Sequence, residues 1–142
     1  MQELLSRLTA IHHFSKTIHY KSEGESFYGD HLLADRLGDG LDGFKDSINE
    51  VCFLGEGVPT PLSKDVLEGA IKFLPDEKKK CFELLGEMDD LIVDTLEHIQ
   101  DLTGSKDEGK LSVGEENLLG GIAEDLQLKH GLLVLRLKQA RL

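Results

Sequence analysis

The chain has 142 residues, an ordinary hydrophobic content of 39% and a formal net charge of -11. Its length predicts a single domain over residues 1–142, and its hydrophobic content argues against disorder. The acidic charge argues against nucleic-acid binding, which needs a basic surface, and fits either solubility or an interior that attracts metal cations.

Two amphipathic helices are predicted in the first part of the chain. The first covers about residues 2–23, and Gly24 after it is a typical helix stop. The second covers about residues 26–54, and Gly55 and Gly57 end it. The expected inward stripes are Leu4, Leu8, Ile11 and Ile18 in the first helix, and Leu33, Leu37, Leu41, Phe44, Ile48 and Val51 in the second.

One short and two long helices are predicted after a turn that contains two prolines. The short helix covers about residues 63–73, with Ser63 as its expected cap. The third long helix covers about residues 75–102, a loop follows at residues 103–114, and the fourth covers about residues 115–142. The expected inward stripes are Cys81, Leu85, Met88, Ile92, Leu96 and Ile99 in the third helix, and Leu119, Ile122, Leu126, Leu133 and Leu137 in the fourth.

These elements predict an all-α fold, namely a ferritin-like four-helix bundle with a short extra helix between its second and third long helices. A four-helix bundle needs one long crossover if its middle helices run parallel, which is the ferritin-like arrangement. The connection from Gly55 to Pro75 is long enough for that crossover.

Four potential metal ligands recur at suggestive spacings. His19, near the end of the first predicted helix, precedes His31, in the first turns of the second, by twelve residues. Asp46 follows His31 by fifteen residues, and Glu50 follows Asp46 by four, which places both carboxylates on one helix face. Two carboxylates and two imidazoles are a suitable ligand set for iron.

The ligands of a straight second helix cannot all reach one ion within one chain, because fifteen residues of helix span about 22 Å. Two copies of this helix, packed antiparallel across a twofold axis, would place His31 opposite the partner's Asp46 and the partner's Glu50, twice by symmetry. Gly38 and Gly40 lie near the midpoint, where the two helices would cross. Close backbone approach there would offset the roughly 1 kcal/mol that each interior glycine costs a helix.

A polar stripe along the second helix also allows a simpler interpretation. If the stripe is only a solvated helix face, the spacing of its histidine and carboxylates has no function. The residues alone leave both interpretations open. The stripe comprises His31, Asp35, Asp39, Asp42, Asp46 and Glu50.

Three motifs connect the chain to a known family. The ligands His19, His31, Asp46 and Glu50 match the pattern H-x11-H-x14-D-x3-E without a gap. The stretch FYGDHLL is similar to N-F-x-x-L-H at the opening of a second helix, and LKHGLLVLRLK is similar to K-H-x-W-x-L-x-A near the end of a last helix. With the helix order and the short connecting helix, residues 4–138 resemble the Dps proteins, or miniferritins.

The resemblance implies a cytoplasmic, hollow dodecamer built from twofold dimers. Dps proteins oxidise Fe(II), usually with hydrogen peroxide, and store the ferric product inside, which protects against oxidative stress. The resemblance assigns His19, His31, the partner's Asp46 and the partner's Glu50 as the catalytic iron ligands, in a site that stays open to peroxide. Iron is the only metal or cofactor that it implies.

The chain departs from the Dps pattern at three places. Tyr20 stands where the family usually has Trp, and tyrosine could serve as an alternative one-electron donor. Val51 follows Glu50 where the family commonly has Arg, which puts a contact behind the ligands in doubt. The first helix begins almost at Met1, without a lysine-rich tail, so DNA binding is not expected.

The remaining histidines are assigned to structural or surface positions. No E-x-x-H motif occurs, which argues against a di-iron site inside one bundle. His98 and His130 are interpreted as structural. His12 lies on a face similar to that of His19 and is interpreted as a surface residue, with a position near the metal as the alternative.

Two acidic residues and two thiols are the remaining candidate functional residues. Glu115 and Glu116 are interpreted as favourable charges at a helix N-terminus, and an acidic pore is the alternative that the resemblance implies. Cys52 and Cys81 are expected to be reduced, buried thiols of a cytosolic protein. No apolar run has the length that a signal peptide or a membrane span needs.

Two functional hypotheses follow. The first is an iron-oxidising and iron-storing miniferritin, with ferroxidase activity at intersubunit sites. The second is a ferritin-like helical assembly or scaffold that binds metal without redox chemistry. Neither nucleic acid nor a membrane is an expected partner, and the proposed site requires a homo-oligomer.

Overall fold

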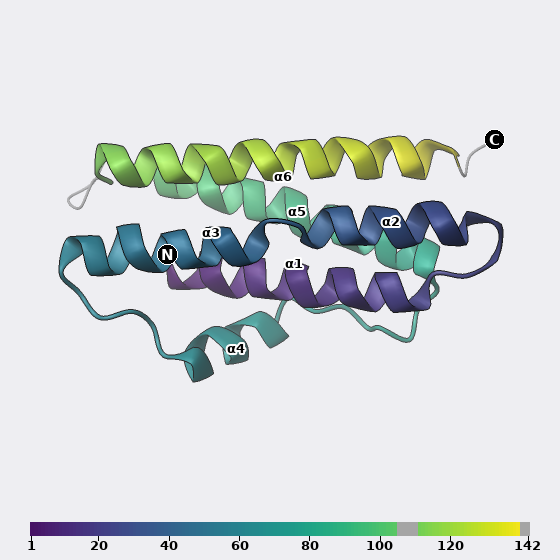
Figure 1. Cartoon of the computed structure of the whole chain (residues 1–142), viewed down its shortest axis with the longest axis horizontal. Helices are drawn as coiled ribbons and strands as arrows, with labels where there is room; N and C mark the ends of the chain where they lie inside the picture. The colour runs from purple at the N-terminus through teal and green to yellow at the C-terminus, as the bar shows by residue number, and fades with distance from the viewer. Residues whose placement is uncertain (105–110, 140–142) are drawn as a thin grey trace.

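Helices make up the secondary structure of the protein (Figure 1). The structure is a computed structural model that describes residues 1–104 and 111–139, and this part of the chain contains no strand, as the all-α prediction requires. No helix in the same part has both the length and the apolar character to span a membrane. The helices are α1 (Gln2–Lys21), α2 (Phe27–Gly38), α3 (Leu41–Ile48), α4 (Ser63–Ile71), α5 (Cys81–Gly104) and α6 (Val113–Gln139).

Four long segments, namely α1, α2 with α3, α5 and α6, run side by side (Figure 1). α2 and α3 return end to end along α1, α5 runs in the same direction as α2 and α3, and α6 returns along α5. An ion pair supports this direction of α5, because His98, late in α5, pairs with Glu3 at the start of α1. The connection from α3 to α5 therefore spans the bundle, and α4 lies within it on the outer side of α1, where Ser6 Oγ donates to the Val66 carbonyl at 2.9 Å.

The long segments share one hydrophobic core, and the predicted stripes of the first, third and fourth long helices supply most of it. Full burial of such a side chain contributes about 1.5–3 kcal/mol each. Cys81, Leu96 and Leu137 from these stripes are only partly buried, and Phe14 adds a large buried ring. The buried predicted residues are Leu4, Leu8, Ile11, Ile18, Leu85, Met88, Ile92, Ile99, Leu119, Ile122, Leu126 and Leu133.

The second long helix is not continuous, contrary to the prediction over residues 26–54. α2 ends at Gly38, Asp39 is extended, and Gly40 takes a left-handed φ of 78° before α3 begins. This φ is strained for residues with a side chain, so glycine fits the break. The apolar repeat of the sequence does not indicate the break, because Leu37 and Leu41 on either side of it are both fully buried.

A π-helical turn, Asn49–Phe53, follows α3 and alters the inward face. Val51 was expected to face the core, but it is 36% exposed, whereas Cys52 is only 6% exposed. A π-turn closes i→i+5 hydrogen bonds, so it holds one residue more than an α-turn and rotates the following side chains. The prediction for Val51 is therefore wrong, and Cys52 takes its place.

The connection before α5 differs from its prediction in two respects. Leu62 is the N-cap residue of α4 and Ser63 makes no capping hydrogen bond, so the predicted cap is wrong. Residues 75–80 are not helical, and α5 begins only at Cys81. The Asp76 carboxylate accepts from the Lys78 backbone N–H at 3.0 Å, a local turn that competes with helix formation.

The last predicted loop and helix are only partly within the described residues. α6 begins at Val113, two positions before the predicted start. Residues 105–110 of the predicted loop and residues 140–142 of the predicted helix lie outside the described part of the chain.

Candidate functional site

The structure brings His19 and His31 into direct contact. His19 lies in the last turn of α1 and His31 in the second turn of α2, and their stacked rings have centroids 3.6 Å apart. His19 Nδ1 lies 3.1 Å from the His31 carbonyl oxygen, and His31 Nδ1 lies 3.1 Å from the His19 carbonyl oxygen. The predicted histidine pair therefore exists within one chain, and the turn between α1 and α2 creates it.

These reciprocal hydrogen bonds define which nitrogen can bind a metal. A carbonyl oxygen only accepts, so each Nδ1 must carry the proton and donate it. In the neutral ring this leaves the Nε2 lone pair of His19 and of His31 free for a ligand. Metal-binding histidines usually have their other nitrogen held in this way, which orients the ring.

Asp35, a residue of the predicted polar stripe, joins the histidine pair. One of its carboxylate oxygens lies 3.1 Å from His19 Nδ1, which thus has two acceptors. Asp35 follows His31 by four residues in α2, so both residues lie on the same face of that helix. This spacing was the available signal for Asp35.

Asp46 and Glu50 lie beyond the helix break, away from the histidine pair. Asp46 is in α3 and Glu50 is in the π-turn, and both are exposed. Neither carboxylate has an ion-pair or hydrogen-bond partner among the side chains that the structure describes. Both therefore remain available to a cation, and π-turns occur frequently at functional sites.

The two halves of the predicted site do not meet within one chain. In residues 1–104 and 111–139, no three His, Cys, Asp or Glu side chains form a metal-binding group. At the break, lined by residues of α1, α2 and α3, lies a polar hollow of about 540 Å³. His12, Lys16, Arg36 and Asp42 contribute to its lining. One chain thus presents a histidine half before the break and a carboxylate half after it.

Three of the other histidines, His12, His98 and His130, contact carboxylates of their own chain. His98 pairs with Glu3 at 2.8 Å, and His130 pairs with Asp89 at 2.6 Å, so each of these two histidines links two helices. These pairings support the structural interpretation of both. His12 is half-buried, 3.4 Å from an Asp42 carboxylate oxygen, rather than on the surface as expected, and burial lowers its pKa.

Glu115 has a local structural role. Its backbone N–H donates to Ser112 Oγ at 3.1 Å, and its carboxylate accepts from the Ser112 N–H at 3.0 Å. This reciprocal pair is a capping box, which satisfies backbone donors at the start of α6. Glu115 is only 9% exposed, whereas Glu116 is exposed. The capping contact supports the helix N-terminus interpretation for Glu115.

The two thiols are free and poorly suited to metal binding or nucleophilic attack at neutral pH. Burial, with Glu115 beside it, raises the pKa of the Cys52 thiol to about 11. Burial also raises the pKa of Cys81, which is half-buried rather than buried as expected. Both thiols therefore stay protonated, and the thiolate is the form that reacts and binds metals.

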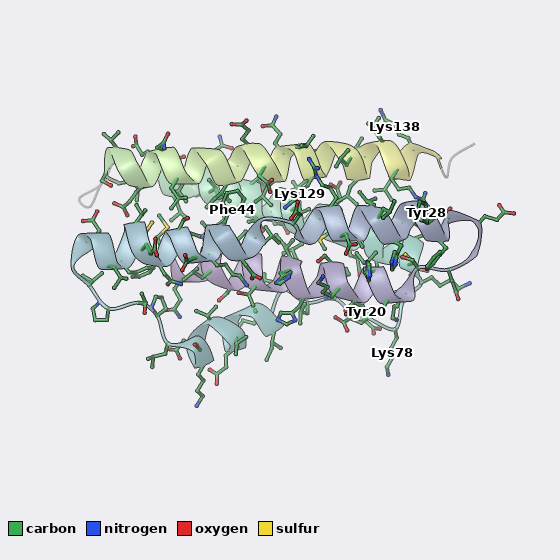
Figure 2. The ribbon with its side chains drawn as sticks, in the orientation of Figure 1. Tyr20, Tyr28, Phe44, Lys78, Lys129 and Lys138 are labelled. Carbon is green, nitrogen blue, oxygen red and sulfur yellow. The ribbon has the colours of Figure 1, made fainter. Side chains whose placement is uncertain are left out.

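Tyr20, which stands where the sequence resemblance expects tryptophan, lies beside the histidine pair. Its ring makes an edge contact with the His19 ring, with centroids 5.5 Å apart. Tyr20 is labelled in Figure 2 and lies near the end of α1. Most of its surface is exposed, so the core does not require it.

No protein-family model matches the chain, and a search of curated proteins finds no match.

Proposed function

We propose that the protein is an iron-oxidising and iron-storing miniferritin, with Fe(II) as its substrate at sites shared between two subunits. The histidine pair carries this proposal: His19 and His31 hold their Nδ1 protons against each other's carbonyl oxygens and leave Nε2 free. Two oriented imidazoles with free Nε2 atoms, at the spacing of the Dps pattern, argue against a solvated helix face without function. The unpaired carboxylates of Asp46 and Glu50 supply the complementary half.

The ligand chemistry fits Fe(II) oxidation. The neutral imidazoles would bind Fe(II), and the anionic carboxylates would favour the more highly charged Fe(III) that forms. Two Fe(II) ions each give one electron to hydrogen peroxide, the O–O bond breaks, and both oxygen atoms reach the oxidation level of water. Water loses protons as ferric oxyhydroxide forms. Peroxide is consumed without release of hydroxyl radicals.

The topology supports the ferritin-like part of the proposal. Parallel middle segments joined by a long crossover are the arrangement of ferritin-like bundles, and α4 occupies the position of the short extra helix. A twofold axis near the polar hollow would bring each histidine pair to the partner's Asp46 and the partner's Glu50. Further symmetry would assemble such dimers into a hollow cytoplasmic dodecamer that stores the ferric product.

The direct test follows Fe(II) oxidation by absorbance, with and without peroxide, and sizes the product by gel filtration. His31→Ala should lower the initial rate on the order of tenfold or more, because it removes a ligand. The control is His13→Ala, since His13 is exposed on α1 and outside the histidine pair. It should oxidise iron like the wild type.

Two outcomes would contradict the proposal. A His31→Ala protein that oxidises iron as fast as the wild type would show that the site assignment is wrong. A wild-type protein that forms an assembly but neither oxidises Fe(II) nor consumes peroxide would favour the scaffold alternative.

A further inference from the structure

Lys129 of α6 is buried inside the bundle, with 1% of its surface exposed. Its ammonium group lies 2.6 Å from the Asp39 carbonyl oxygen and 2.8 Å from a carboxylate oxygen of Asp125, one turn earlier in α6. Burial of a charged group is unfavourable unless it is paired and hydrogen-bonded. Figure 2 shows Lys129 between α6 and the break, whereas Lys138 points away from the helices.

The atom that Lys129 binds belongs to the break between α2 and α3. Asp39 caps the C-terminus of α2, where carbonyl oxygens lack partners within the helix. Lys129 supplies a donor to one of them and a positive charge at the negative end of the helix dipole. The next residue, Gly40, turns the chain into α3. Lys129 thus fixes α6 to the break between α2 and α3.

A second cation of α6 holds the other end of α2. Arg136 Nε lies 2.7 Å from one carboxylate oxygen of Asp30, and Arg136 Nη2 lies 3.2 Å from the other. Asp30 is in the first turn of α2. The helix that carries His31 and Asp35 is therefore attached to α6 at both ends, which fixes its register.

The break separates the two halves of the proposed metal site. His31 precedes it in α2, and Asp46 and Glu50 follow it in α3 and the π-turn. The angle between α2 and α3 therefore sets the distance from the histidine half to the carboxylate half. In a twofold dimer this distance affects the geometry of both metal sites. Tight binding requires that the ligand groups be placed within about 0.5 Å.

We propose that Lys129 is a positioning residue, which fixes the angle at the break and so aligns the histidine and carboxylate halves of the metal site. This inference rests on the proposed function. It predicts that neutralising Lys129 weakens metal binding although Lys129 does not contact the metal. It also predicts faster opening of the backbone at the break.

The test uses the full chain and Co²⁺, which reports its ligands through visible absorption. Lys129→Met alone leaves the Asp125 carboxylate without its partner, so the main variant is Lys129→Met with Asp125→Asn. The control is Lys138→Met, an exposed lysine of the same helix. Circular dichroism checks helix content, Co²⁺ titration gives affinity, and hydrogen exchange reports the amides of residues 39–44.

The double variant should keep its helix content, because a buried ion pair is often replaceable by neutral groups. Its Co²⁺ affinity should fall about tenfold or more, as when other outer contacts of a metal site are lost. Hydrogen exchange of the amides of residues 39–44 should accelerate by a similar factor. Lys138→Met should change neither the Co²⁺ affinity nor this exchange.

Three outcomes overturn the inference. The first is wild-type Co²⁺ affinity in the double variant, the second is unchanged exchange at the break, and the third is failure of the double variant to fold, which would show a general structural role. A wild-type protein that binds no Co²⁺ contradicts the proposed function instead.

Discussion

Gly38 packs closely against α1 of its own chain. A Cβ at this position would lie 2.5 Å from Ser15 Oγ and 3.4 Å from Ser15 Cβ. Ser15 is buried, and its hydroxyl donates to the His12 carbonyl at 2.6 Å, so it moves away only by losing that hydrogen bond. The close backbone approach predicted for this glycine is therefore found between α2 and α1. An approach between two subunits is not needed to explain it.

Gly38→Ala should lower the free energy of unfolding by about 1 kcal/mol, because overpacking outweighs the gain in helix propensity. Gly43→Ala is the matched control, since a Cβ there meets nothing within 4 Å. It should raise the free energy of unfolding by roughly 0.5–1 kcal/mol. Urea unfolding measures both. Adding Ser15→Ala to Gly38→Ala should restore part of the loss, and purely additive effects would show that Ser15 is not the obstacle.

Residue types and spacing predict that His19 and His31 come together, and the structure shows this contact. His19 and His31 are separated by a turn that returns α2 along α1, so a fixed spacing determines their contact. The sequence does not reveal the orientation of the rings, because each ring is held by the other histidine's backbone carbonyl. Nor does it reveal the partner of Lys129, because Asp39 is distant in sequence and offers its backbone rather than its side chain.

At the scale of single elements, α6 begins with a capping box formed by Ser112 and Glu115. Ser112→Ala should lower the free energy of unfolding by about 1 kcal/mol, because one backbone donor loses its partner. Ser63→Ala is the control, since Ser63 makes no capping hydrogen bond at the start of α4. The free energy of unfolding of Ser63→Ala should differ from that of the wild type by no more than about 0.5 kcal/mol. Equal losses in the two variants, measured by urea unfolding, would contradict the capping role of Ser112.

The existence and direction of the long helices follow from apolar periodicity, but their interruptions do not. Leu37 and Leu41 continue the periodic stripe across the break because the chain resumes its inward face after Gly40. The π-turn is likewise hidden, since Val51 and Cys52 are both acceptable core residues and packing selects Cys52. In both cases two local structures fit the apolar pattern of the sequence equally well, and tertiary packing selects one of them.

At the scale of the whole molecule, one chain carries both halves of the proposed metal site, and among the described residues these halves do not close the site within one chain. The histidine pair lies before the break, and the unpaired carboxylates lie after it in α3 and the π-turn. The net charge of -11 opposes close association of two copies unless bound cations neutralise part of it. Metal ions at the shared sites would supply that neutralisation, so dimerisation and iron binding should reinforce each other.

Mixing two inactive variants tests whether the site is shared. His31→Ala removes the histidine half, and Asp46→Asn with Glu50→Gln removes the carboxylate half. In a dimer of one copy of each, one site combines both defects, but the other combines the two intact halves. Random refolding of an equal mixture makes half of the dimers mixed, so about a quarter of wild-type iron oxidation should return. Each variant refolded alone is the control. A site closed within one chain cannot be repaired by mixing, so an inactive mixture of well-folded dimers would contradict the shared site and leave His19 and His31 to act without the partner's carboxylates.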